Sequence, residues 1–131
     1  MEEGVLGQIK RSVIGEIFDD EQIISSNSGS GNNWAVGYSN YGNLYREEIM
    51  DAIRRQVEFC DALSSFVVIS SLGGGTGSGL GSFVGEQLAD EYPDVLKFAS
   101  AVFPSKDDDV VTSPYNSFVP VPLFIISPLA S

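Results

Sequence analysis

The sequence has 131 residues, of which 43% are hydrophobic, and its 18 acidic and 7 basic side chains give a formal net charge of −11. This length and apolar content predict one globular domain or part of one. The acidic balance argues against nucleic acid as a partner, because a phosphate backbone is bound by clustered Lys and Arg side chains. The chain has no histidine and a single cysteine, which excludes an internal disulfide, Ser-His-Asp catalysis and the usual zinc sites.

Neither end of the chain predicts a membrane segment. The start, "MEEGV", is acidic and lacks the apolar stretch of a signal peptide. The longest apolar run, residues 118–131, is interrupted by Pro120, Pro122 and Pro128 and is too short to cross a bilayer. We therefore expect no membrane partner and a cytoplasmic location.

The first third of the sequence predicts a helix, a short strand and a long loop. An amphipathic helix over residues 5–18 is indicated by apolar residues at every fourth position, namely Val5, Ile9, Val13 and Ile17. After a turn at Asp19-Asp20, "QIIS" at residues 22–25 is typical of a strand, and the Gly- and Asn-rich residues 26–43 are typical of a loop. A loop of this length in a small domain is usually functional or disordered.

The middle of the sequence predicts a long helix followed by a buried strand. The helix covers residues 45–63, and its apolar face is formed by Ile49, Ile53, Val57 and Cys60. This position predicts that Cys60 is a buried thiol rather than a nucleophile. Residues 64–72, "SSFVVISSL", form a continuous apolar run without polar alternation, which predicts a strand buried on both faces.

A further helix and strand complete a βαβ unit. Apolar residues at helical spacing, Leu80, Phe83, Val84 and Leu88, precede Pro93, where the helix must end. Residues 97–103, "KFASAVF", predict a second buried strand. Two parallel strands joined through a helix require a right-handed crossover, so the predicted fold class is α/β.

The glycine-rich loop after the first buried strand lies where open α/β sheets bind ligands. The free N–H groups at the start of the following helix attract anions, and glycines let the backbone approach an anion and adopt positive φ. Thr76 and Ser78 add hydroxyl donors. The spacing fits neither a Walker loop, since no lysine is present, nor the G-x-G-x-x-G pattern of dinucleotide-dependent oxidoreductases.

Residues 73–79, "GGGTGSG", resemble the nucleotide-binding signature of the tubulin family, which includes the bacterial division-ring GTPases. Four further segments resemble tubulin segments in the same order and spacing: "SGSGNNWAVG", "CDAL", "DEYPD" and "VTSPYNS". "GSGNN" and "DDVVTSPYNS" are most similar to the epsilon type. The resemblance covers residues 1–118, which we expect to form a GTP-binding domain, and leaves residues 119–131 as an apolar, Pro-rich tail.

The resemblance implies a nucleotide site built from two loops and a strand end. The residues that it places around the α- and β-phosphates of GTP are Gly73, Gly74, Gly75, Thr76, Gly77 and Ser78. Those in the loop that senses the γ-phosphate are Ser30, Gly31 and Asn32; without a ligand, their amides would simply be solvated. Ser71 matches a family nucleotide contact, and the alternative is a polar strand terminus.

Three further positions correspond to ribose and metal contacts. Asp109 matches the ribose-contacting aspartate, although an acidic run is also typical of a solvated loop. Ser113 stands where many tubulins carry a glutamate that contacts the sugar. Glu2 matches the acidic residue that holds Mg²⁺, usually through water. Trp34 is expected to be a packing anchor rather than a platform for the base.

The resemblance also implies an architecture and a role. The fold would be a partial doubly wound, mostly parallel sheet that lacks the family's first strand, which belongs upstream of "MEEG". The expected partners are guanine nucleotide and other tubulin subunits in head-to-tail contact, in the cytoplasmic cytoskeleton and, for an epsilon type, at the centriole or basal body. The family hydrolyses GTP on assembly, but the loop that activates hydrolysis is not in this sequence, so no catalytic residue is assigned. The alternative is a truncated product with impaired nucleotide binding that acts only as an interaction fragment.

Overall fold

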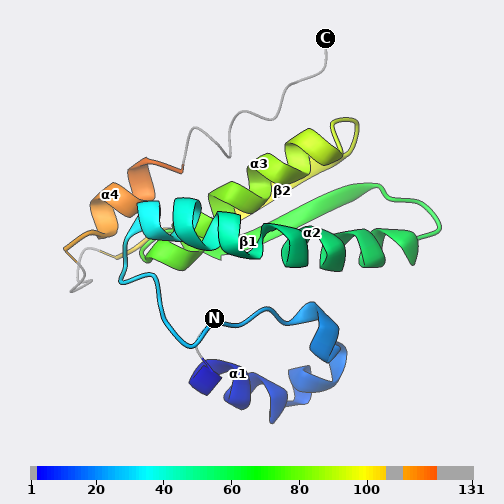
Figure 1. The fold of residues 1–131 in the computed structure, drawn as a ribbon, viewed down its shortest axis with the longest axis horizontal. Helices are drawn as coiled ribbons and strands as arrows, with labels where there is room; N and C mark the ends of the chain where they lie inside the picture. The colour runs from blue at the N-terminus through cyan, green and yellow to red at the C-terminus, as the bar shows by residue number, and fades with distance from the viewer. Residues whose placement is uncertain (1–2, 106–110, 121–131) are drawn as a thin grey trace.

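The computed structural model describes residues 3–105 and 111–120, which form several helices and a small parallel sheet (Figure 1). In chain order the helices and strands are α1 (Glu3–Lys10), η1 (Val13–Ile17), η2 (Asp20–Gln22), η3 (Val36–Tyr41), α2 (Gly42–Glu58), β1 (Ser65–Ser71), η4 (Thr76–Leu80), α3 (Gly81–Glu91), β2 (Leu96–Val102) and α4 (Ser113–Phe118). Among these residues, no helix is long and apolar enough to cross a membrane.

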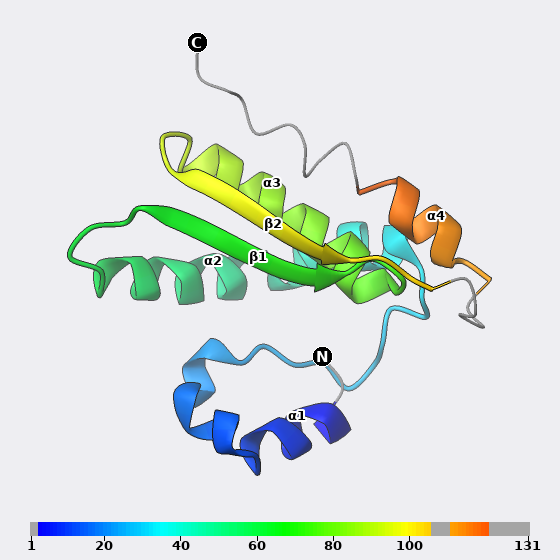
Figure 2. The ribbon, with the colours of Figure 1, turned by 180° about the vertical axis from the view of Figure 1, so that it is seen from behind.

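The two strands confirm the predicted α/β class. β1 and β2 pair in parallel, with Ser65 opposite Leu96 and Ser71 opposite Val102, and α3 makes the connection between them. Both strands end at the side of the sheet where α4 lies (Figure 2). The carboxyl ends of the strands, the start of the glycine-rich loop and α4 therefore meet in one place.

Helices α2 and α3 cover only one face of the sheet (Figure 2). Phe66 points to this face, where its ring lies 5.2 Å from that of Tyr92. On the opposite face Val67 is 62% exposed and Phe98, its partner in register, 56% exposed. The prediction of strands buried on both faces is therefore wrong for the part of the chain that the structure describes, because both of its long helices lie on the same side.

The N-terminal region also departs from the prediction. The single helix predicted over residues 5–18 is divided, because α1 ends at Lys10 and the Ser12 hydroxyl donates to the carbonyl of Ile9 at 2.7 Å. The strand predicted at residues 22–25 is absent from the described chain, and Gln22 instead ends η2, where its side chain accepts the Asp19 N–H at 3.0 Å. A side chain that bonds the local backbone favours a turn over strand pairing.

The long loop is shorter than expected, because helical structure begins at Trp34 and continues through the π-helical η3 into α2. The Asn33 side chain caps this start by accepting the Ala35 N–H at 2.9 Å. Gly37 and Gly42 suggested a loop, yet both are packing positions. A Cβ atom on Gly37 would lie 2.1 Å from the Gly75 carbonyl oxygen, and one on Gly42 would lie 2.7 Å from the Phe83 ring.

At its other end, α2 stops at Glu58 rather than at residue 63. Cys60 therefore lies beyond the helix and is exposed, so the prediction of a buried thiol is wrong. The Cys60 Sγ donates to the carbonyl of Gln56 at 3.4 Å. The periodic spacing of apolar residues in the sequence thus extends beyond the last residue of the helix.

Candidate functional site

A polar cavity of about 490 Å³ opens at the carboxyl end of β1. It brings together eight of the residues predicted to bind nucleotide, from segments about 40 positions apart in the chain: Ser30, Gly31, Asn32, Ser71, Gly74, Gly75, Thr76 and Gly77. Ser28 and Gly29 complete the lining. The two loops that the sequence placed around the phosphates thus form opposite walls of one cavity.

The glycines of the loop allow close approach of backbones. A Cβ atom on Gly75 would lie 2.5 Å from the backbone nitrogen of Asn33, and one on Gly79 would lie 2.2 Å from the Trp34 carbonyl oxygen. Real Cβ atoms do not come this close, so η3 and η4 pack glycine against backbone. The expected positive φ is not found in this loop: among the described residues, only Gly31 and Asn32 have it.

Those two positive values belong to the opposite wall. Gly31 has φ 59° and Asn32 has φ 53°, and the Asn33 N–H donates to the Ser30 carbonyl at 3.1 Å. Two successive residues with positive φ, closed by this bond, form a tight turn of the type that favours Gly and Asn. The wording "GSGNN" therefore encodes the turn that closes the cavity on this side.

Hydroxyl groups join the walls. Ser30, which is 7% exposed, shares a hydrogen bond of 3.1 Å between its Oγ and the Oγ1 of Thr76. Ser78 does not line the cavity, because it is fully buried and its hydroxyl donates to the Gly74 carbonyl. Thr76, rather than Ser78, is thus the hydroxyl-bearing residue of the glycine loop that lines the cavity.

Helix α4 supports both walls from behind. The Ser113 hydroxyl donates to the Gly73 carbonyl at 3.2 Å, so Gly73 and Ser113 contact each other outside the cavity lining. Asn116, which was not among the predicted site residues, donates from Nδ2 to the carbonyl of Asn32 at 2.7 Å and to that of Gly73 at 3.2 Å. A signal was present, since polar residues four positions apart at Thr112, Ser113, Asn116 and Ser117 mark one polar helix face.

The aromatic residues at the start of the long helix fix its position. Trp34 stacks on Tyr38 with ring centroids 4.7 Å apart, and it does not line the cavity, which agrees with a packing role. The Tyr38 hydroxyl donates to the Glu86 carboxylate on α3. This hydrogen bond, with a smaller contribution from burial, raises the pKa of Tyr38 to about 12.

Two predicted residues, Glu2 and Asp109, lie outside the described residues. Within residues 3–105 and 111–120 no group of three or more Cys, Asp or Glu side chains is placed to hold a metal ion. The ten residues of the cavity lining include no charged side chain. In the described part of the site, an anion would therefore meet backbone N–H groups and hydroxyls rather than a positively charged side chain.

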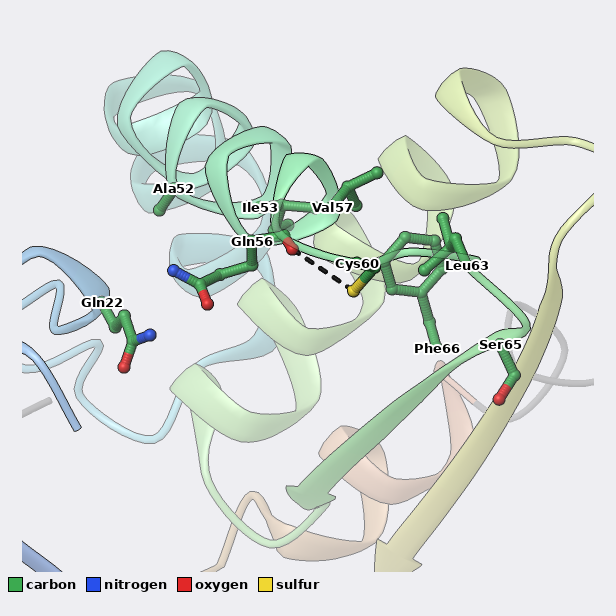
Figure 3. A pocket seen from close by; sticks show the side chains of 9 residues that line it. All are labelled: Gln22, Ala52, Ile53, Gln56, Val57, Cys60, Leu63, Ser65 and Phe66. Carbon is green, nitrogen blue, oxygen red and sulfur yellow. Dashed lines mark hydrogen bonds between the residues drawn. The ribbon is translucent and has the colours of Figure 1, made fainter. Parts of the chain in front are cut away.

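A second cavity, of about 370 Å³, lies between the end of α2 and the start of β1 (Figure 3). Its walls are mostly apolar and include Ile53, Val57, Leu63 and Phe66, with the Cys60 sulfur beside them. None of the residues predicted to contact nucleotide lines it. The polar cavity is therefore the candidate functional site.

Comparison with known proteins also points to the tubulins. The chain is 53% identical over 119 residues to the tubulin epsilon chain of Mus musculus and 50% identical over 119 residues to that of Homo sapiens; each alignment covers 91% of this chain and 25% of the relative. It is 40% identical over 122 residues to the tubulin beta-1 chain of Mus musculus, covering 92% of this chain and 27% of the relative. The chain thus spans about a quarter of the length of these relatives.

The family description "Tubulin/FtsZ family, GTPase domain" matches residues 1–122. This range contains both loops of the polar cavity and the α4 helix that supports them. The resemblance read from five short segments is thereby confirmed over almost the whole sequence. This chain belongs to the Tubulin/FtsZ family, within its GTPase domain.

Proposed function

We propose that the polar cavity binds the phosphates of GTP together with Mg²⁺. The observation that carries this proposal is the meeting of the glycine loop with the turn at residues 30–33 around a cavity of about 490 Å³. Family membership supports guanine nucleotide as the ligand. The preference for guanine over adenine rests on the family alone, because no base-contacting residue was identified in this sequence.

The described geometry divides the predicted phosphate residues into two groups. Gly74, Gly75, Thr76 and Gly77 line the cavity and are proposed to contact the α- and β-phosphates. Gly73 and Ser78 are engaged with α4 and with the Gly74 carbonyl, so their proposed part is to hold the loop. On the other wall, Ser30, Gly31 and Asn32 are proposed to meet the γ-phosphate.

Magnesium is part of the proposal for an electrostatic reason. The chain has a net charge of −11, and the lining of the cavity has no cation to offset a polyphosphate. At physiological salt the screening length is about 8 Å, so remote carboxylates matter little and local donors decide. Mg²⁺ would neutralise charge on the phosphates themselves, with Glu2 as its proposed ligand and Asp109 as a proposed ribose contact. Ser113, predicted as a second ribose contact, is 3% exposed and donates to the Gly73 carbonyl, so its proposed part is to hold the glycine loop.

The cellular role follows from the relatives and is likewise proposed. A tubulin-type protein of the cytoskeleton in the cytoplasm fits the names of the tubulin epsilon and tubulin beta-1 chains. We propose head-to-tail association with other tubulin subunits and, from the epsilon similarity, a place in centriole or basal-body organisation. The division into residues 1–118 and a tail at 119–131 stays a prediction.

The test is isothermal titration of the 131-residue chain with Mg-GTP, with Mg-ATP and EDTA-treated GTP as comparisons. We expect Mg-GTP to bind, to raise the melting temperature, and to lose affinity when magnesium is removed. A cooperatively folded chain that binds neither Mg-GTP nor magnesium tripolyphosphate would refute the proposal.

That negative outcome would favour the alternative, an interaction fragment that does not bind nucleotide. The exposed apolar side chains on the uncovered face of the sheet support this second candidate; they are Val67, Ile69, Leu96, Phe98 and Val102. Contiguous apolar surface of this kind marks interaction sites or aggregation-prone regions. The two candidates are separated by whether the folded chain takes up magnesium nucleotide.

A further inference from the structure

The side-chain amide of Asn116 connects the two walls of the polar cavity. It is 3% exposed, and all of its hydrogen-bonding groups are used. Its Nδ2 donates to the carbonyls of Asn32 and Gly73, at 2.7 and 3.2 Å, while its Oδ1 accepts the Trp34 N–H at 3.0 Å. Among the described residues of α4, Asn116 bonds to both walls, whereas Ser113 and Ser117 bond only to the glycine-loop side.

The bond to Gly73 has a geometric consequence for the cavity. In a trans peptide, the C=O of one residue and the N–H of the next point to opposite sides. Because the Gly73 carbonyl is drawn toward α4, the Gly74 N–H points away from α4. Gly74 lines the cavity, and Gly73 does not.

This peptide needs an external anchor. It lies between two glycines, and without Cβ atoms little opposes its rotation. A rotated peptide would present the carbonyl oxygen where the N–H now points, and a carbonyl dipole in that direction repels an anion. Two neighbouring hydroxyls share these acceptors, since Ser113 Oγ donates to the Gly73 carbonyl at 3.2 Å and Thr112 Oγ1 to the Asn32 carbonyl at 2.7 Å. Asn116 differs from both because its single amide group bonds the two carbonyls together.

We propose that Asn116 is a positioning residue that orients the Gly73–Gly74 peptide and holds it in register with the turn at residues 30–33. Its effect on ligand affinity rests on the proposed function, namely the binding of a magnesium-complexed polyphosphate in this cavity. Its effect on the two loops does not, and it is measurable without any ligand.

The central variant is Asn116→Asp, which keeps the size and the acceptor for Trp34 but replaces the donating NH₂ with a carboxylate oxygen. That oxygen would face two carbonyl oxygens. Asn116→Ser, a small neutral variant, serves if the aspartate variant does not fold. Tyr115→Ala, at a side chain of the same helix that is 75% exposed, is the matched control.

Hydrogen–deuterium exchange of the nucleotide-free chain is the first readout. We expect Asn116→Asp to speed exchange at least tenfold in residues 30–34 and 73–78 and to leave residues 66–70 of β1 unchanged. Equal exchange in the aspartate and Tyr115→Ala variants would overturn the proposal. This readout stands even if the wild-type chain does not bind nucleotide.

Affinity for Mg-GTP and for magnesium tripolyphosphate is the second readout. We expect both to fall at least tenfold in Asn116→Asp. Val68→Ala, a destabilising change on the covered face of β1, should leave both affinities within twofold of wild type, which separates positioning from loss of stability. Affinities within twofold of wild type in Asn116→Asp would contradict the proposal, whereas no binding by wild type would count against the proposed function.

Discussion

Gly77 lies directly against the end of β1, where a Cβ atom added to it would be 2.1 Å from the carbonyl oxygen of Ser71. The end of β1 and the first turn of η4 are therefore in direct backbone contact. Gly74 of the same loop is different, because a Cβ atom added to it would meet only the Asn32 Oδ1 at an ordinary 3.5 Å. Alanine substitutions at Gly77 and Gly74 therefore make a matched pair of variants, one with a backbone clash and one without.

Gly77→Ala is expected to lower the free energy of unfolding by about 2 kcal/mol, as overpacking against a backbone atom does. The gain in helix propensity, about 1 kcal/mol, does not offset this clash. Gly74→Ala should change the free energy of unfolding by about 0.5 kcal/mol or less. Urea unfolding followed by the fluorescence of Trp34, the single tryptophan, measures both; equal effects would show that the backbone approach at Gly77 is relaxed.

The hydroxyl pair across the cavity predicts a loss of binding without a loss of fold. Thr76→Ala removes the hydroxyl that meets the Oγ of Ser30, and Thr76 is itself exposed. We expect the dissociation constant for Mg-GTP to rise about tenfold, which corresponds to about 1.4 kcal/mol. Ser39→Ala, on η3 and outside the cavity lining, is the control. Titration calorimetry decides; an unchanged constant in Thr76→Ala would remove this hydroxyl from the site.

The bond between Tyr38 and Glu86 predicts an alkaline loss of stability. The pKa of Tyr38 is raised from 10.0 in the unfolded reference to about 12, chiefly by the hydrogen bond to Glu86. The stabilisation is therefore complete below pH 10 and is lost as the pH rises toward 12, because only the unfolded chain releases the proton in that interval.

Tyr38→Phe should cost about 1 kcal/mol at neutral pH and abolish this part of the alkaline loss. Stacking of the ring on Trp34 is kept in the variant. Urea unfolding of both proteins at pH 8, 10 and 11 gives the difference. Parallel pH profiles would show that the hydrogen bond does not persist in solution.

The uncovered face of the sheet predicts self-association. Replacing Val67 and Phe98, which pair in register, by threonine keeps β propensity and removes apolar surface. The double variant is expected to sediment as a smaller, more uniform species than the wild type at equal concentration, with little change in its unfolding midpoint. Val68→Thr, on the covered face, should instead lower stability. Identical sedimentation of wild type and double variant would show that this face does not associate.

The exposed thiol of Cys60 predicts rapid chemical labelling. Reaction with a disulfide reagent in native buffer should modify one thiol per chain at a rate close to that of the unfolded chain, because the side chain is exposed and lies beyond α2. A rate that increases strongly in denaturant would indicate a buried thiol in solution.

Local patterns in the sequence determined the α/β class and the parallel βαβ unit, and the resemblance of its motifs to tubulin segments pointed to most residues of the candidate site. The apolar run at β1, the helical periodicity after the glycines and the signature "GGGTGSG" each consist of residues that are close together in the sequence. Each can therefore be recognised without knowledge of the fold. The ends of helices were predicted less well. Cys60 continued the apolar period of α2, yet the helix ended before it, because periodicity records which face is apolar and not where the hydrogen bonding stops.

Only the tertiary structure decided how segments far apart in the chain meet. Gly37 and Gly42 suggested a loop in sequence, and only contact with Gly75 and Phe83 shows why glycine stands there within a helix. The role of Asn116 depends on carbonyls more than 40 residues away, whose direction no local pattern encodes. A hydrogen-bonding side chain has many partners open to it in the unfolded chain, and the fold selects among them by bringing particular backbone groups within reach.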